Sequence, residues 1–327
     1  MSIFSPKLFY IKQRENVGGG NGMSEPTRRS EVELIKELIT TMRPKQWYKN
    51  LVIFVGIIFS LNLLNFQMWL DVISAFAIFC MLSGSEYIIN DIIDVEKDRK
   101  HPKKCKRPIA SGKLKVSHAL LFAIILIIVA GGGAYLINTQ FLVVSITYFL
   151  LILFYSLFLK HLIIVDILVI SIGFVIRAIA GCLAINVFIS PWLVICAFLL
   201  ALFLALGKRR HELILLAENA KEHRRILEGY SVEMLDQMIS ITTGALIISY
   251  SLYTFLTDNI CMMFTIPLVI YGLFRYLFLV HSKNIGEEPE MLFKDKGMMI
   301  CMVLWVILVV AILYGFPNVM IRLLEGV

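Results

Sequence analysis

Three aspartates stand at a spacing that places their carboxylates on one stripe of an α-helix. Asp91, Asp94 and Asp98 follow one another at i, i+3 and i+7, which is a single face if the helix continues through them. Three like charges on one face repel each other unless cations neutralise them. Mg²⁺ takes a few carboxylate ligands, keeps several waters and bridges to phosphate oxygens. The spacing therefore predicts a magnesium site for a diphosphate leaving group. The alternative is a solvated acidic helix end paired with nearby Lys and Arg.

A basic, turn-rich stretch follows the aspartates directly. It covers residues 101–112 and contains Lys103, Lys104, Lys106 and Arg107. Carboxylates for a metal beside cations for phosphate oxygens make the pairing that phosphoryl chemistry needs. This neighbourhood favours the metal-site interpretation over the solvated helix end.

The elements that must position these residues are membrane helices. The 327-residue chain is 58% hydrophobic and 17% charged, which is too apolar for a water-soluble domain of this size. Apolar runs recur along it, each near the roughly 20 residues that a helix needs to cross the hydrocarbon. We expect an all-α polytopic membrane protein with nine transmembrane helices, at 47–64, 69–90, 118–137, 140–159, 161–185, 191–207, 234–256, 262–281 and 297–316.

Lys and Arg fall almost entirely on one side of these helices. Of the 31 basic residues, 27 lie in the segment before Trp47 and in the connections on that same side. Cytoplasmic loops retain positive charge during insertion, so we expect a cytoplasmic N-terminus, a C-terminus on the opposite side and an active site that faces the cytoplasm. The net charge of +7 is thus a signal of topology, and we expect no nucleic-acid partner. The sequence leaves open whether the chain forms a homo-oligomer.

The polar N-terminal region divides into two parts ahead of a single transmembrane catalytic domain at 44–317. Residues 1–29 have no apolar period, and we expect them to be disordered. Over 30–43, a capping box at Ser30 and Glu33 and an apolar stripe that Pro44 closes predict an amphipathic helix along the inner membrane interface. A short tail at 318–327 follows the domain. The six cysteines are scattered, and we expect them to be reduced core residues.

Ionisable residues inside the apolar runs form a second group of candidates, because charges within a membrane are costly and default to function. Glu86, Asp166 and Arg275 lie about 6 to 9 Å below one membrane boundary at 1.5 Å per residue. The residues at that boundary are Lys160, Lys208, Arg209 and Arg210. A polar pocket that opens inward would gather them, and the alternative is a set of interhelical ion pairs such as Arg275 with Asp166. Arg177 lies deeper, and its role is open.

These residues resemble the motifs of a known family. Asn90, Asp91, Asp94, Asp98 and Arg99 are similar to the first aspartate motif of the UbiA superfamily of membrane prenyltransferases. Tyr155 to Lys160 with Asp166 look like the second motif, although a second full DxxxD pair is absent. The resemblance is closest to the branch that transfers phosphoribosyl groups to decaprenyl phosphate, and it rests on segments 43–50, 101–104, 107–112, 173–181, 207–212 and 288–295.

The resemblance implies a UbiA-like bundle and a specific reaction. The 5-phosphoribosyl group of phosphoribosyl pyrophosphate would pass to a polyprenyl phosphate of the decaprenyl type in the lipid bilayer. Pyrophosphate would leave, and the product would be a precursor of cell-wall arabinan or a related lipid-linked ribose. The cofactor would be Mg²⁺, held by Asp91, Asp94 and Asp98.

The resemblance also implies a division of labour among the other candidates. Lys45 and Lys49 would hold the lipid phosphate, while Tyr155, Lys160 and Asp166 would orient the ribose or a second ion. We expect the remaining substrate-binding residues to be Asn90, Arg99, Lys104, Arg107, Lys208, Arg209 and Arg275.

Two other functions use similar residues. A UbiA-type aromatic prenyltransferase would apply the same metal chemistry to a polyprenyl diphosphate, and the aspartates alone do not exclude it. Cations on two sides of the pocket, at 99–107 and 208–210, fit phosphoribosyl pyrophosphate better because it carries phosphates at both ends. A membrane transporter would need internal repeats and polar exits on both faces, whereas the outer connections here are short and uncharged.

Overall fold

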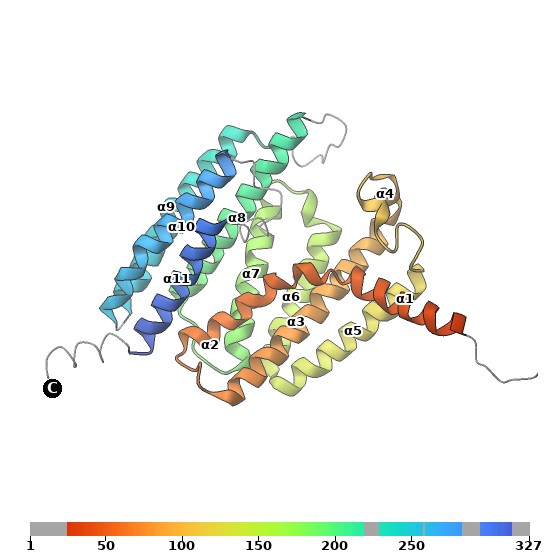
Figure 1. The fold of residues 1–327 in the computed structure, drawn as a ribbon, viewed down its shortest axis with the longest axis horizontal. Helices are drawn as coiled ribbons and strands as arrows, with labels where there is room; N and C mark the ends of the chain where they lie inside the picture. Colours follow the sequence, from red (N-terminus) through yellow and green to blue (C-terminus); the bar gives the residue numbers. More distant parts are fainter. Residues whose placement is uncertain (1–24, 219–228, 258, 283–294, 316–327) are drawn as a thin grey trace, which may run out of the picture.

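The chain folds into a bundle of membrane-length helices. The computed structural model describes residues 25–218, 229–257, 259–282 and 295–315, and the regular structure in these ranges is all helical (Figure 1). Eight segments are long and apolar enough to cross a membrane, as expected of a multi-pass membrane protein. They are α3 (Phe66–Ile93), α5 (Val116–Ile137), α6 (Thr139–Leu157), α7 (Val165–Ala184), α8 (Pro191–Glu218), α9 (Val232–Leu256), the 3-10 helix η5 (Ile260–Thr265) with α10 (Ile266–Ser282), and α11 (Lys296–Leu313).

The first expected transmembrane segment, at 47–64, differs from the prediction. Pro44–Phe54 form a 3-10 helix, η1, and Val55–Phe59 form a short α-helix, α2. The expected continuous α-helix is therefore wrong in type. A 3-10 helix rises about 2.0 Å per residue and an α-helix about 1.5 Å, so η1 and α2 together extend about 30 Å, which is the thickness of the hydrocarbon core.

The first segment packs closely against α7. A Cβ atom on Gly181 of α7 would lie 2.0 Å from the carbonyl oxygen of Ile53. On the other side of the contact, a Cβ atom on Gly56 would lie 2.9 Å from the Sγ of Cys182. Only glycine permits such approaches, so η1 and α2 lie directly against the backbone of α7.

Helices that are neighbours in the chain are also neighbours in space. α3 packs against α5, α6 against α7, α7 against α8, α8 against α9 and α10 against α11. Figure 1 shows α9, α10 and α11 on one side of the bundle and α3 and α5 on the other. A core around Phe79, Phe141 and Tyr148 joins η1, α3, α6 and α7. A second core, around Phe203 and Tyr276, joins α7 and α8 to α9, α10 and α11.

The N-terminal helix, α1, runs from Glu25 to Thr41. The expected start at Ser30 is therefore wrong by five residues, while residues 1–24 lie outside the described part of the chain. Leu34 and Leu38 pack against residues of α3 and α5, and an opposite stripe of apolar side chains, Val32, Ile35 and Ile39, is exposed. The helix is amphipathic as expected, and its place at a membrane interface stays a prediction.

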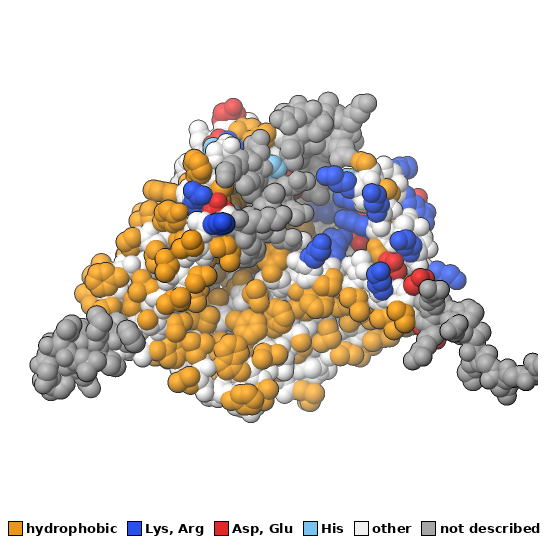
Figure 2. All heavy atoms as spheres, viewed as in Figure 1, with side chains coloured by type: hydrophobic (Ala, Val, Ile, Leu, Met, Phe, Trp, Pro, Cys, Tyr) orange, Lys and Arg blue, Asp and Glu red, His pale blue; other side chains and the backbone are white. Residues whose placement is uncertain are grey.

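Charged side chains gather at one end of the bundle, which we call the charged end. This end contains the last turn of α3, the short helix α4 (Val95–Lys100), the 3-10 helices η2 (Lys104–Lys106) and η3 (Leu159–His161), and the first turn of α7. Figure 2 shows Lys and Arg side chains collected around α4 at the upper right, whereas hydrophobic side chains cover the body of the bundle. The six cysteines are free: Cys80, Cys182 and Cys301 are buried as expected of core residues, whereas Cys105, Cys196 and Cys261 are only half-buried.

Candidate functional site

Asp91 and Asp98 lie at the charged end and share one arginine. Each residue is 3% exposed. Arg107 Nη1 donates hydrogen bonds to Asp91 Oδ1 at 2.9 Å and to Asp98 Oδ2 at 2.5 Å. Arg43, which precedes η1, donates to Asp91 Oδ1 as well, and its guanidinium lies 4.8 Å from the ring centre of Tyr87. Two cations from separate segments thus hold the first and third aspartates.

The second aspartate, Asp94, contacts a different segment. α3 ends at Ile93 and α4 begins at Val95, with Asp94 at the junction between them. Asp94 Oδ2 accepts a hydrogen bond from Lys160 Nζ at 3.0 Å, and its Oδ1 lies 3.7 Å from Lys97 Nζ. The expectation of one continuous helical stripe of three carboxylates is therefore wrong, because the helix is interrupted at its middle member.

Asp166 is the centre of a second group of polar side chains. It is fully buried, and both of its carboxylate oxygens are hydrogen-bonded. Arg209 Nη2 donates to Oδ2 at 2.5 Å and the Tyr230 hydroxyl donates to Oδ1 at 3.0 Å. Arg209 Nη1 also donates to Glu212 at 2.6 Å, whereas its buried Nε has no partner among the described residues. The group joins the start of α7 to the charged end of α8.

Tyr230 holds the chain just ahead of Asp166. The expected helix start at 161 is wrong, because residues up to Ile164 form η3 and a turn, and α7 begins at Val165. Ile164 has a φ of 69°, which is strained for a β-branched residue, and its N–H donates to the Tyr230 hydroxyl at 2.6 Å. Burial raises the pKa of Tyr230 to about 12, so the hydroxyl stays protonated at neutral pH and donates to Asp166.

The two groups are connected along the chain and in space. Lys160, which binds Asp94, lies in η3, and η3 leads through the turn at Ile164 into the helix that carries Asp166. Tyr155, near the end of α6, is half-buried and is an electrostatic neighbour of Arg209. The structure thus brings Asp91, Asp98 and Arg107, then Asp94 and Lys160, then Asp166 and Arg209 into one connected series.

The other predicted site residues vary in their exposure. Lys45, Arg99 and Lys208 are exposed, and Arg99 pairs with Glu96 at 2.7 Å. A further set is half-buried at or near the charged end and comprises Lys49, Asn90 and Lys104. Arg275 forms an ion pair with Asp295 between α10 and α11, at 2.9 and 3.0 Å, instead of joining Asp166. The structure therefore does not connect Arg275 to the series.

A buried polar network lies deeper in the bundle, around Arg177. Its Nε donates to Asn50 Oδ1 at 2.8 Å, its Nη1 to the Gly173 carbonyl at 3.0 Å, and its Nη2 to the Tyr148 hydroxyl at 2.5 Å. The Tyr148 hydroxyl donates in turn to Glu86 Oε2 at 3.3 Å. The deep arginine therefore joins η1, α6 and α3, a role that the sequence left open.

The aspartates fit Mg²⁺ by their chemistry, with Asp91 and Asp98 as the better pair. Within the described ranges, no group of three or more His, Cys, Asp or Glu side chains is arranged to hold a metal. Mg²⁺ needs only one or two carboxylates when water and phosphates complete its shell. Asp91 and Asp98 each use one oxygen for the arginine pairs above, which leaves the other oxygen out of those pairs. Both oxygens of Asp94 face ammonium groups.

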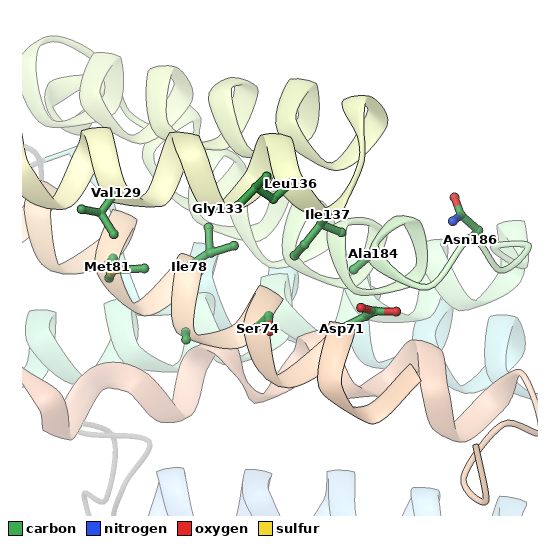
Figure 3. Close-up of a pocket in the computed structure, with 11 residues that line it drawn as sticks. Asp71, Ser74, Ile78, Met81, Val129, Gly133, Leu136, Ile137, Ala184 and Asn186 are labelled. Carbon is green, nitrogen blue, oxygen red and sulfur yellow. The ribbon is translucent and has the colours of Figure 1, made fainter. Parts of the chain in front are cut away.

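A groove of about 470 Å³ lies toward the opposite end of the bundle (Figure 3). α3 supplies Asp71, Ser74 and Ile78 to one wall, and α5 supplies Gly133 and Leu136 to the other. Asp71 precedes Asp91 by 20 residues on the same helix, which is about 30 Å along its axis. The predicted site residues do not line this groove, so it is separate from the charged end.

The sequence did not reveal several partners of the buried charged residues. Arg43 was visible in the segment 43–50, but nothing local indicated that it reaches Asp91. Tyr230 carried no signal, because it joins Asp166 across 64 residues. Tyr148 lies within an apolar run and looks like an ordinary core aromatic. These partners are set by tertiary packing alone.

Comparisons with known proteins identify the family. Residues 51–300 match the UbiA prenyltransferase family. The chain is 30% identical over 308 residues to a decaprenyl-phosphate phosphoribosyltransferase of Mycolicibacterium smegmatis, with 89% of this chain and 96% of the relative covered. It is 32% identical over 304 residues to a protein of the same name from Corynebacterium glutamicum, with 89% and 90% covered.

The fold agrees with the sequence match. The structure of a UbiA homologue from Archaeoglobus fulgidus bound to DMAPP and Mg²⁺ gives a TM-score of 0.66 at 18% identity. The match covers 85% of this chain and 99% of that one. The family match spans most of the chain, and the relatives are matched over nearly their whole length. This protein is therefore an enzyme that belongs to the UbiA prenyltransferase family.

Proposed function

We propose that this enzyme transfers the 5-phosphoribosyl group of phosphoribosyl pyrophosphate to a polyprenyl phosphate of the decaprenyl type, with Mg²⁺ as its cofactor and pyrophosphate as the leaving group. The two relatives named as decaprenyl-phosphate phosphoribosyltransferases support the acceptor and the transferred group. The product would serve as a lipid-linked precursor of cell-wall arabinan or of a related ribose-bearing lipid.

The observation that carries the proposal is that cations from four segments contact buried and half-buried carboxylates at the charged end. Arg43 and Arg107 contact Asp91, while Lys160 and Arg209 come from η3 and α8. Phosphoribosyl pyrophosphate has phosphates at both ends of a small sugar, so it needs cations on two sides. The two groups of side chains supply cations at two separate places within one connected series.

The pyrophosphate end of the donor fits the first group. Mg²⁺ bound by Asp91 and Asp98 would neutralise the charge that develops on the leaving pyrophosphate. Arg43 and Arg107 would bind its oxygens, because guanidinium groups match phosphate geometry. Lys104 and Arg99 lie on the adjoining segments and would extend this set of cations.

The sugar and its 5-phosphate fit the second group. Arg209 has a buried Nε donor without a partner among the described residues, which suits a phosphate oxygen, and exposed Lys208 adds a second cation beside it. Asp166 would fix Arg209 in place, because its carboxylate is engaged on both oxygens. Tyr155 and Lys160 would face the sugar from the end of α6 and from η3.

The acceptor needs little activation. A phosphate monoester is largely ionised near neutral pH, so a lipid phosphate attacks the anomeric carbon without a strong general base. The bond between that carbon and its new phosphate oxygen forms as the bond to pyrophosphate breaks. Lys45 and Lys49 of η1 would hold the lipid head group, and the polyprenyl chain would remain in the bilayer. We further infer that the charged end faces the cytoplasm, where the soluble donor is supplied.

The alternative within the family is transfer of a prenyl chain to an aromatic ring. The Archaeoglobus homologue, whose structure holds DMAPP, supports a fold that takes an allylic diphosphate. Such a donor has phosphates at one end only and would leave the Asp166 and Arg209 group without a phosphate partner. Phosphoribosyl transfer uses both groups and is therefore the better fit.

The test is an assay of two substrate pairs with the purified full-length protein and Mg²⁺. One mixture contains phosphoribosyl pyrophosphate labelled in the ribose and decaprenyl phosphate, and the other contains labelled polyprenyl diphosphate and an aromatic acid. We expect labelled sugar to enter the lipid fraction in the first mixture only, and to require the acceptor lipid. A prenylated aromatic product from the second mixture, with no labelled lipid from the first, would refute the proposal.

A further inference from the structure

Glu86 is a buried carboxylate beside the site for which the proposed reaction has so far given no role. It lies on α3 and is 6% exposed. Its Oε2 accepts a hydrogen bond from the Tyr148 hydroxyl. Its Oε1 is buried and has no hydrogen-bond partner among the described residues. A buried acceptor without a donor is costly, so a donor from outside the chain is expected at this oxygen in the working enzyme.

The other hydrogen bonds of this network hold the Glu86 side chain in place and leave Oε1 as its unpaired acceptor. Arg177 Nη2 donates to the Tyr148 hydroxyl at 2.5 Å, and its Nε is engaged by Asn50. Tyr148 is 1% exposed and is held between Arg177 and Glu86. The carboxylate is thus restrained through one oxygen, which leaves the other as a fixed acceptor.

The position of Glu86 on α3 places it one turn beneath the pyrophosphate side of the site. Asn90 follows at i+4 and lies on the same helical face, and helical side chains lean toward the N-terminus of their helix. Half-buried Asn90 therefore lies above Glu86. Asp91 stands five residues beyond Glu86, which is about 7.5 Å along the helix. On this helix, Asn90 therefore stands between the level of Glu86 and the level of Asp91.

The unpaired oxygen also restricts the chemistry of the group that it binds. A carboxylate repels phosphate and accepts hydrogen bonds from hydroxyls, and carboxylates recognise ribose hydroxyls in dinucleotide sites for this reason. Asp166 is the other buried carboxylate near the sugar, but both of its oxygens already have donors. Asp91 and Asp98 each keep one oxygen outside their arginine pairs, but the proposed function assigns those oxygens to Mg²⁺. Glu86 is therefore the carboxylate that can take a sugar hydroxyl without losing an existing bond or a metal ligand.

We infer that Glu86 accepts a hydrogen bond from the 2- or 3-hydroxyl of the ribosyl donor and so determines the enzyme's specificity for ribose. This inference rests on the proposed function. Sites that are built to hydrogen-bond a hydroxyl reject the analogue that lacks it, because the protein group is then left unpaired.

The test compares donors that lack one hydroxyl. The purified enzyme is assayed with phosphoribosyl pyrophosphate and with its 2-deoxy and 3-deoxy analogues, in the wild type and in the Glu86→Met and Glu86→Gln variants. In the wild type we expect one deoxy donor to lose about 10- to 100-fold in kcat/KM, the range for leaving a buried acceptor without its donor. In Glu86→Met, which has a similar volume and no acceptor, that loss falls to within about twofold, and Glu86→Gln is intermediate.

The matched control is Asp71→Asn, a loss of carboxylate charge at the other end of the same helix, and it keeps the wild-type discrimination. Two results would overturn the inference: a wild type that uses both deoxy donors as well as ribose, or full discrimination in the Glu86 variants. The comparison of donors in the wild type tests the inference even if Glu86→Met does not fold. A wild type that transfers no phosphoribosyl group at all overturns the proposed function and this inference with it. Transfer without hydroxyl discrimination overturns the inference alone.

Discussion

At the scale of single residues, the site depends on which cation pairs with which carboxylate. Arg107 binds Asp91 and Asp98 together, while Asp94 pairs with Lys160 on a different segment. Buried charges of this kind are stable only when each has a partner. The same cations can move to phosphate oxygens once a metal neutralises the aspartates, which makes the arrangement suitable for binding a charged donor.

Replacing Asp91 or Asp98 by asparagine removes a charge with almost no change in shape. We expect each variant to lose about 100-fold or more in transfer rate, the range for losing one group that stabilises developing charge, while the protein still inserts into the membrane. Initial rates at saturating lipid acceptor check the loss, and membrane fractionation checks insertion. Asp71→Asn, on the same helix but in the separate groove, serves as the control with normal rates. Undiminished activity in both variants would remove the metal-site assignment.

The Tyr230 hydroxyl makes two hydrogen bonds, and one substitution removes both. Tyr230→Phe leaves the Ile164 N–H without an acceptor and takes a donor from Asp166. The cost of unpaired buried polar groups is about 1–3 kcal/mol each, so we expect a lower thermal unfolding temperature in detergent together with a raised KM for the donor. Tyr135→Phe, at a tyrosine of α5 that is 67% exposed, is the comparison and should leave the unfolding temperature unchanged. Equal unfolding temperatures for the two variants would show that the Tyr230 bonds are unimportant.

The sequence identified the residue types of the site better than their pairing. Asp91, Asp98, Arg107, Lys160, Asp166 and Arg209 were all candidates, and the structure connects them. Arg275 was expected beside Asp166, but it pairs with Asp295, because α10 and α11 lie together. Pairing depends on which helices are neighbours, and helix spacing along the chain does not encode that.

At the scale of elements, the contact between η1 and α7 brings the two backbones close together near the site. It positions Asn50 against Arg177 and places Lys49 just before that contact. Its geometry depends on glycine, because Gly181 faces the carbonyl oxygen of Ile53 with no room for a side chain.

A pair of glycine substitutions tests this packing. Gly181→Ala would bring a methyl group within 2.0 Å of the Ile53 carbonyl oxygen and force the helices apart, so we expect a large drop in thermal stability and loss of transfer. Gly131→Ala in α5 has open space around the new methyl group and should stabilise that helix by about 0.5–1 kcal/mol. Thermal unfolding in detergent compares the two. A Gly181→Ala protein as stable as the Gly131→Ala protein would contradict the close approach.

Apolar length predicted most helices well, and it failed where local geometry departs from the α-helix. The run at 47–64 is apolar enough to cross a membrane but forms η1 and α2, which pack against α7. The aspartate stripe assumed an unbroken helix, and the break at Asp94 has no apolar signature. Hydrophobicity reports burial in lipid and is insensitive to how the backbone is wound.

At the scale of the whole molecule, charged side chains are concentrated at one end of the bundle (Figure 2). Lys and Arg gather at the charged end (Figure 2), and insertion retains such residues in the cytoplasm. A single cysteine placed in an otherwise cysteine-free protein reports its own side of the membrane. We expect Lys106→Cys to react with an impermeant thiol reagent only in inverted vesicles, and Asn186→Cys, at the opposite end, only in intact cells. The reverse pattern would invert the proposed topology.

The central claim is that the buried aspartates and their cations hold a diphosphate donor through magnesium. Its most direct test is the equilibrium binding of phosphoribosyl pyrophosphate to the purified protein by calorimetry, without any lipid acceptor. The account predicts binding in the presence of Mg²⁺ that is lost when EDTA removes the metal and is lost in Asp91→Asn. Binding of equal strength with EDTA, or in Asp91→Asn, would contradict it.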